Sequence, residues 1–280
     1  MLRLLTILLL MLLPSCTTIH SLRQDADALA LSAGMHPVEI PTVGFTLLAY
    51  DRISDPQAPV RVYIEGDGNA WLTRSEISPN PTPHDPMALK LAIRDNTPNV
   101  AYIARPCQYI VSAQCAPKYW SSAEYSESVI ASVSQALNRW HGKRIELVGY
   151  SGGAAVVLLV AARRDDVIAI RTVAGNLDTD AFTQFHHVSP LTESLNPASM
   201  ASRTAMIPQI HFTGSNDTIV PYSLVAHYQK NLPKENCSAH AVVAHADHYS
   251  GWAEQWPTLL TRPLPCTTSD QATPGWLPIR

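Results

Sequence analysis

Two periodicities of apolar residues alternate along this chain. Short apolar runs of strand length recur, and between them apolar residues lie three and four positions apart, as on one face of a helix. We expect strands near residues 39–40, 45–51, 61–65, 99–104, 145–148, 169–174, 209–213 and 240–244, and helices over 25–33, 85–95, 121–141, 222–231 and 251–260 and directly after residue 153. Strands that alternate with helices predict a mostly parallel sheet, and the first strands, joined by loops, predict an antiparallel beginning.

The pattern changes most sharply within 144–162. An apolar run leads into Gly-Tyr-Ser-Gly-Gly, with Ser151 at its centre, and an Ala- and Leu-rich stretch follows, as in a buried helix. A serine raised between a strand and a helix needs a strained backbone and small neighbours, which Gly149 and Gly153 supply. The free N–H groups at the start of the helix favour a developing anion. The segment therefore predicts a nucleophilic serine.

A serine hydroxyl needs a base, and the base needs a carboxylate to orient it. Residues 209–221 form a predicted strand and turn that end in Asp217, and the loop after the last predicted strand carries His245 and His248. Asp178, after the preceding strand, is an alternative acid. Asp217 could instead cap the next helix, and His245 could be a loop histidine that orients Asp247.

The order of the elements, the GYSGG turn and the later Asp and His resemble the α/β-hydrolase fold over roughly residues 39–262. This resemblance implies Ser151 as nucleophile, Asp217 as acid in a G-x-x-D-x-x-V-P segment, and His248 as base. The chain order Ser, Asp, His agrees with this fold. Residues 176–208, too long for a plain connection, are expected to form a cap or lid beside the site.

The resemblance also implies an oxyanion hole made of two backbone N–H groups. Gly152 supplies one by position, and Asp67 supplies the other, in a loop where the family commonly has His-Gly-x-Gly. This chain departs from the pattern with Glu65 in place of the histidine. We expect the Asp67 carboxylate to point away, because it would otherwise oppose the charge that its N–H stabilises. A simple Gly-rich turn is the alternative.

The segment His-Ala-Asp-His at 245–248 also resembles part of a zinc-binding signature of the metallo-β-lactamase fold. The position of the first histidine is Val243 here, and the segment lies late in the chain. Adjacent ligands alone do not close a zinc site. We therefore expect no metal, and no motif for a cofactor is present.

Length and charge limit the function classes. The 280 residues suit one large α/β domain, and the net charge of −3 gives no reason to expect nucleic acid or an anionic membrane surface as a partner. We divide the chain into a signal peptide (1–15), a tether with a short helix (16–38), a hydrolase domain (39–266) and a C-terminal tail (267–280).

The N-terminus predicts export. A positive start is followed by an apolar stretch over residues 4–13, which is shorter than the roughly 20 residues that span a bilayer. Leu13-Pro14-Ser15-Cys16 then resembles the bacterial lipobox, which implies that Cys16 is lipidated and becomes the mature N-terminus. Thr17 after the cysteine implies the outer membrane, facing the periplasm; an ordinary signal peptide is the alternative.

Four of the five cysteines remain when Cys16 is set aside. An even number in an exported chain suggests two disulfides with three possible connectivities. We expect the pairing that is local in sequence, Cys107 with Cys115 and Cys237 with Cys266.

We expect a small ester-like substrate, cleaved through an acyl-enzyme, because serine hydrolases of this fold mostly cleave esters. Amide, thioester or peptide cleavage stays open. The alternative from another class is a lipid-anchored binding or structural protein of the envelope that retains a relic of the site.

Overall fold

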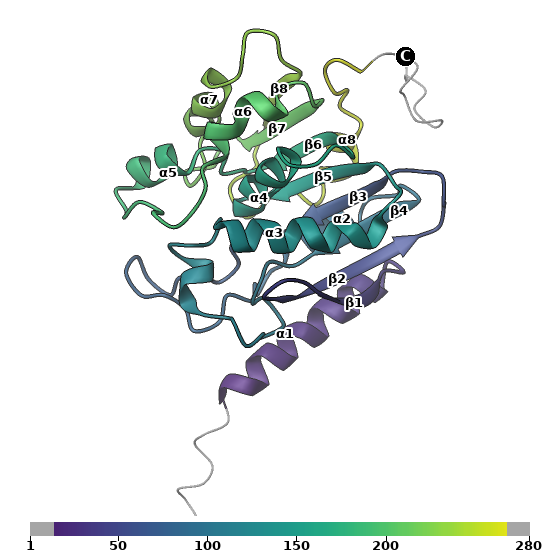
Figure 1. Cartoon of the computed structure of the whole chain (residues 1–280), viewed down its shortest axis with the longest axis vertical. Helices are drawn as coiled ribbons and strands as arrows, with labels where there is room; N and C mark the ends of the chain where they lie inside the picture. Colours follow the sequence, from purple (N-terminus) through teal and green to yellow (C-terminus); the bar gives the residue numbers. More distant parts are fainter. Residues whose placement is uncertain (1–13, 268–280) are drawn as a thin grey trace, which may run out of the picture.

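Residues 14–267, which the computed structural model describes, form an eight-stranded sheet between two layers of helices (Figure 1). The strands are β1 (His36–Pro41), β2 (Thr46–Ile53), β3 (Val60–Ile64), β4 (Asn99–Ile103), β5 (Ile145–Tyr150), β6 (Val167–Val173), β7 (Gln209–Gly214) and β8 (Ser238–Val243). Their order in the sheet is β1-β2-β4-β3-β5-β6-β7-β8. Figure 1 shows β1 and β2 at one edge and β8 at the other.

The antiparallel beginning predicted from the sequence is confirmed. β1 pairs with β2 and β2 pairs with β4 in antiparallel register, and all the remaining pairs, from β4 to β8, are parallel. Every residue of β3, β4 and β7 is buried. Helices on both faces account for this burial and for the near-continuous apolar runs of these strands.

Two hydrophobic cores lie on opposite faces of the sheet. One contains residues of α3 (Glu127–Ala136), α4 (Gly152–Ala161) and α7 (Tyr222–Lys230). The other contains residues of α1 (Pro14–Leu31), α2 (Met87–Ala92) and α8 (Trp256–Leu260). All ten residues of α4 are buried, which explains why this helix has no polar face.

Helix α1 begins much earlier than expected. The sequence predicted a polar tether from Cys16 and a helix over 25–33, whereas the helix starts at Pro14. An ion pair one turn apart, Arg23 with Asp27, stabilises it, and Asp27 also accepts a hydrogen bond from Tyr50 on β2. The predicted signal peptide falls almost entirely on residues 1–13, which lie outside the described residues.

Several other helices are shorter than predicted. In the helix expected over 121–141 the cause is visible, because backbone groups of its first turn are committed to tertiary contacts. The helix expected over 121–141 becomes α3 and a final 3₁₀ turn, η2 (Leu137–Trp140), preceded by the 3₁₀ turn η1 (Pro117–Trp120). The carbonyl of Glu124 accepts from Arg105, and the N–H of Tyr125 donates to Ser194, so neither group enters a helical ladder. In the last helix, residues 251–255 form turns before α8.

Residues 176–208, the predicted cap, contain α5 (Thr179–His186), η3 (Pro197–Met200) and α6 (Ala201–Thr204). Ala181 of α5 packs with Val220 and Leu224 in a small apolar cluster. This segment therefore borders the turn that carries Asp217.

Both predicted disulfides are present: Cys107 is bonded to Cys115, and Cys237 to Cys266. Within residues 14–267 no helix combines the length and apolar character needed to cross a bilayer. The same residues contain no group of His, Cys, Asp and Glu side chains able to hold a metal ion.

Candidate active site

Ser151 lies at the apex of a sharp turn between β5 and α4. Its φ of 51° and ψ of −121° place a non-glycine residue in a strained region of backbone space. The N–H of Ser151 donates to Val173 at 3.0 Å, which fixes the turn against the neighbouring strand. A Cβ on Gly149 would collide with the backbone of Gly153, and one on Gly153 with the carbonyl of Ile64. The two glycines are needed for close packing, as the sequence predicted.

Three side chains from three loops meet at the carboxyl end of the sheet. The Oγ of Ser151 is 3.0 Å from Nε2 of His248, and Nδ1 of His248 is 3.0 Å from Oδ2 of Asp217. His248 and Asp217 are 6% and 5% exposed, so water has little access to the bond between them. This is the geometry in which a histidine accepts a serine proton while a carboxylate fixes its tautomer.

Asp217 is held as a carboxylate by its surroundings. Burial would raise the pKa of Asp217, but the hydrogen bond with His248 and those from two backbone N–H groups together lower it below its usual value. The two N–H groups belong to Ile219 and Val220, and each donates to Oδ1 at 2.8 Å. One oxygen is thereby fixed by the backbone while the other faces His248.

The alternatives left open by the sequence lie elsewhere. Asp178 is the N-cap of α5, where Oδ1 accepts from the N–H of Ala181 and from the side chain of Asn196. His245 is exposed. The carboxylate of Asp247 accepts hydrogen bonds from Tyr249 and Ser250. Neither Asp178 nor His245 joins Ser151, and no hydrogen bond links the ring of His245 to Asp247.

The loop after β3 lies directly beside the nucleophile. A Cβ on Gly66 would be 3.0 Å from the ring of Tyr150 and 3.3 Å from Cβ of Ser151. Within the described part of the chain, the backbone N–H groups of Asp67 and Gly152 donate no hydrogen bond. Two unsatisfied donors beside a serine match the arrangement expected of an oxyanion hole.

The side chain of Asp67 does not point away, contrary to expectation. Its Oδ1 lies against Gly152, where a Cβ atom would collide with it. The carboxylate is tolerated there because Arg105, which is 4% exposed, forms an ion pair with it. Sequence reasoning missed Arg105. Its position directly after the predicted strand 99–104, at the edge where the site lies, was the available signal.

Glu65, which occupies the family's histidine position, has a structural role. Its Oε1 accepts from the N–H of Gly66 at 2.9 Å and from that of Ala88 in α2 at 3.2 Å. Burial raises the pKa of Glu65 to about 7, against the opposing effect of these two hydrogen bonds. The side chain thus ties the loop after β3 to the start of α2.

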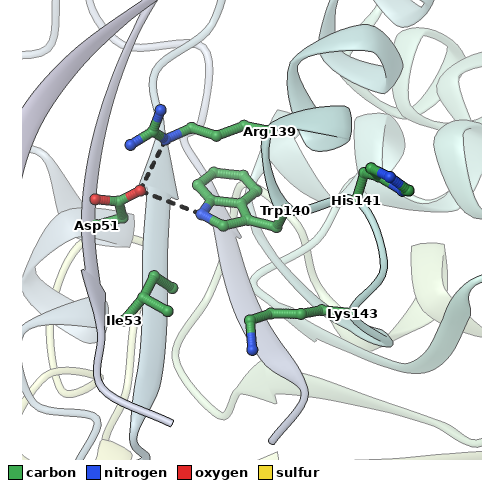
Figure 2. A pocket seen from close by; sticks show the side chains of 6 residues that line it. All are labelled: Asp51, Ile53, Arg139, Trp140, His141 and Lys143. Atoms are coloured by element: carbon green, nitrogen blue, oxygen red, sulfur yellow. Dashed lines mark hydrogen bonds and ion pairs between the residues drawn. The ribbon is translucent and has the colours of Figure 1, made fainter. Parts of the chain in front are cut away.

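A separate cavity of about 300 Å³ lies at the opposite end of the sheet (Figure 2). Asp51 in its wall accepts hydrogen bonds from Arg139 at 2.8 Å and from Trp140 at 3.2 Å. The opposite position follows from the lining residues, because His141 and Lys143 precede β5 whereas Ser151 follows it. The cavity is therefore distinct from the serine site.

Comparison with known proteins identifies the fold. No protein-family model and no curated protein matches the sequence. An alpha/beta hydrolase, GrgF from Penicillium sp. sh18, matches with a TM-score of 0.59 and 13% identity, over 81% of this chain and 96% of its own. An esterase domain from a Rhodothermus marinus protein matches with a TM-score of 0.55 and 15% identity, over 80% and 94%.

A puromycin-hydrolysing peptidase from Mycobacterium tuberculosis matches with a TM-score of 0.59 and 15% identity. The match covers 82% of this chain but only 38% of the peptidase, so this chain spans little more than a third of that protein's length. At these identities the likeness establishes the fold. The chain has the α/β-hydrolase fold that the sequence predicted.

Proposed function

We propose that this protein is a serine hydrolase that cleaves an ester-like carbonyl through an acyl-enzyme. The observation that carries the proposal is the hydrogen-bonded chain from Ser151 through His248 to Asp217, at distances of 3.0 Å and 3.0 Å. The strained backbone of Ser151 and the two free N–H groups beside it support the same assignment.

The reaction follows from these positions. Oγ of Ser151 attacks the carbonyl carbon while Nε2 of His248 takes its proton, and Asp217 stabilises the resulting imidazolium. The N–H groups of Asp67 and Gly152 hold the oxyanion. The bond to the alcohol then breaks, and the alcohol leaves with the proton from His248. Water, deprotonated by His248, then attacks the carbonyl carbon of the acyl-enzyme. The bond from that carbon to Oγ of Ser151 breaks, His248 returns the proton to Oγ, and the acid product leaves.

An active-site probe tests this proposal. The purified protein should react covalently with a fluorophosphonate, and Ser151→Ala should abolish both the labelling and the hydrolysis of p-nitrophenyl acetate. A wild-type protein that takes no label would instead favour a binding or structural role on this fold. Hydrolysis that survives in Ser151→Ala would locate the activity at another site.

Amide cleavage is the second candidate, because one structural neighbour is a peptidase that hydrolyses puromycin. The same three side chains could serve it, with His248 protonating the amine leaving group. Matched p-nitrophenyl esters and p-nitroanilides of one acyl group distinguish the two. We expect kcat/KM to be higher for the ester than for the anilide. The ratio of the two values should far exceed the ratio of their uncatalysed hydrolysis rates in water.

We infer from the sequence that the protein is lipid-anchored at Cys16 in the bacterial envelope, with residues 39–266 as the catalytic domain and 176–208 as its cap. The support is the lipobox-like segment before Cys16. Mass spectrometry of the mature N-terminus in the native host tests the anchor. Cys16→Ser should prevent lipidation and release the protein from the membrane fraction.

A further inference from the structure

A charged cluster of Arg105, Glu124 and the half-buried Asp67 carboxylate lies beside the nucleophile, and none of these three side chains takes part in the mechanism above. The guanidinium of Arg105 donates to Oδ1 of Asp67 and, at 3.4 Å, to Oε2 of Glu124. Its second nitrogen donates to the backbone carbonyl of Glu124, and its carbon lies 5.0 Å from the ring centroid of Tyr125. The side chain of Glu124, the carbonyl of Glu124 and the ring of Tyr125 therefore all hold Arg105 in place, in addition to its contact with Asp67.

The ion pair touches the proposed oxyanion hole. A Cβ on Gly152 would collide with Oδ1 of Asp67 and with the hydroxyl of Tyr125. The Asp67 carboxylate is thus in contact with Gly152, which supplies one N–H of the proposed hole. The other N–H is that of Asp67 itself. An unpaired negative charge at this place would oppose the developing oxyanion at contact distance, although the Asp67 side chain is 35% exposed and solvent screens part of the repulsion.

The charges of the cluster favour pairing of Arg105 with Asp67. Burial, and then the charge of Asp67, raise the pKa of Glu124 well above its usual range, although Arg105 acts in the opposite direction. When Glu124 is protonated, the cluster contains one cation and one anion. The positive charge of Arg105 is then matched by Asp67 alone.

A second contact connects the same two loops. The side chain of Gln108 donates to the carbonyl of Gly66 at 2.9 Å and accepts from the N–H of Arg105 at 3.0 Å. The disulfide between Cys107 and Cys115 closes the loop that carries Gln108. The loop after β3 is therefore braced from the loop after β4 at two adjacent residues.

We propose that Arg105 is a positioning residue of the hydrolase reaction: through its ion pair it cancels the charge of Asp67 beside the oxyanion hole and keeps the Asp67 N–H directed at the substrate. This proposal rests on the function proposed above. It assigns to Arg105 an effect on the transition state, beyond any contribution to folding.

A charge-suppression experiment tests it. Arg105→Gln should lower both kcat on p-nitrophenyl acetate and the rate of fluorophosphonate labelling on the order of a hundredfold, with little change in KM. The reason is that the charge of Asp67 loses its counter-ion and keeps only the hydrogen bond of 3.3 Å from the hydroxyl of Tyr125. Adding Asp67→Asn to Arg105→Gln should raise kcat and the labelling rate again by at least tenfold, since the opposing charge is gone. A residue that acts only through folding would give the reverse, because the second substitution would lower the folded fraction further.

The matched control lies at the other end of α4. Arg164, which lies beyond the end of α4 at Ala161, pairs with Asp166 at 2.8 Å and 2.6 Å. The length of α4, about 15 Å, separates this pair from Gly152. Arg164→Gln, alone or with Asp166→Asn, should leave kcat within about twofold of the wild type. Circular dichroism and urea unfolding establish the folded fraction of each variant.

The outcomes separate the two proposals. Absence of Ser151-dependent labelling in the wild type would overturn the proposed function and the role of Arg105 with it. A labelled wild type in which folded Arg105→Gln reacts at the normal rate, or is not rescued by Asp67→Asn, would overturn the role of Arg105 alone. If Arg105→Gln does not fold, Arg105→Lys takes its place. Arg105→Lys keeps the positive charge, so its kcat should fall only about tenfold. Adding Asp67→Asn to it should not raise kcat.

Discussion

The hydroxyl of Tyr150 donates a hydrogen bond of 2.9 Å to the backbone carbonyl of His248. Tyr150 directly precedes the proposed nucleophile, and its ring lies 5.7 Å from the imidazole. A single side chain therefore connects the turn of Ser151 to the loop of His248. The separation between the proposed nucleophile and base is set from the nucleophile's own strand.

Tyr150→Phe should lower kcat five- to tenfold, because the net contribution of one such hydrogen bond is about 1 kcal/mol and its loss leaves the His248 loop less constrained. KM should change less, since Tyr150 is buried. Tyr222→Phe is the matched control, as Tyr222 is 50% exposed and distant in sequence from both loops. Steady-state kinetics that give equal kcat for wild type and Tyr150→Phe would contradict the role.

The sequence contained enough to predict that Ser151, Asp217 and His248 lie together, because each occurs in a local pattern. The turn at Ser151 is determined by the glycines around it, and Asp217 and His248 each follow a strand whose apolar run is plain. Carboxyl ends of parallel strands meet at one edge of the sheet, so three local predictions became one site. The antiparallel beginning of the sheet, its mostly parallel remainder and both disulfides followed from equally local signals.

Features that depend on contacts distant in sequence could not be predicted. Arg105 and Asp67 are 38 residues apart, and only the folded sheet brings them together. The orientation of the Asp67 carboxylate was predicted wrongly for this reason: its charge was treated as unpaired. The late start of α3 has the same origin, because Glu124 bonds to Arg105 in place of its own helix.

Replacement of Asp217 by Asn should reduce kcat by about 10⁴, because the amide removes the charge and presents a donor to His248. The hydrogen bonds from Ile219 and Val220 to Oδ1 can persist, so the protein should remain folded. Asp178→Asn, at the cap of α5, is the control and should retain nearly full kcat. A large loss in Asp178→Asn would revive Asp178 as the acid.

Stability in acid gives an independent test of Asp217. Its folded-state pKa is lowered, below the unfolded value of about 3.9, so its stabilisation is complete above that pH and is lost as pH falls through the folded pKa. The difference in unfolding free energy between wild type and Asp217→Asn should be constant above about pH 5 and shrink below about pH 4. Urea unfolding across this range measures it.

Glu65 predicts the opposite dependence on pH. Its folded-state pKa is about 7, against about 4.3 in the unfolded chain, so the folded protein holds a proton that the unfolded chain has released. Stability due to this group therefore falls as pH rises from about 4.3 to 7 and then levels off. Glu65→Gln removes this titration and keeps an acceptor for Gly66 and Ala88. Its stability relative to the wild type should increase by a few kcal/mol between pH 5 and pH 8.

The control for that measurement is Glu193→Gln, an exposed carboxylate on the cap segment. Its stability relative to the wild type should change little over the same range. A flat difference for Glu65→Gln would mean that Glu65 is ionised in the folded protein. The hydrogen bonds to the carboxylate, chiefly those from Gly66 and Ala88, would then outweigh its burial.

Removal of each disulfide should affect kcat and the free energy of unfolding to different extents. Cys107 and Cys115 are 8 residues apart and close the loop that carries Gln108, whereas Cys237 and Cys266 are 29 apart. Loop-closure entropy predicts a loss of about 2.5 kcal/mol without the first bond and about 3.5 kcal/mol without the second. The first pair closes the loop whose Gln108 braces the loop after β3, while the second pair lies at the amino end of β8, opposite the site.

Cys107→Ser with Cys115→Ser should therefore lower kcat severalfold at a modest cost in stability. Cys237→Ser with Cys266→Ser should be the less stable protein, yet its folded fraction should turn over substrate at the wild-type rate. Urea midpoints and kcat values corrected for the folded fraction test both statements. Equal kcat in the two double variants would show that Arg105 and Gln108 hold the loop after β3 in position without the covalent bond.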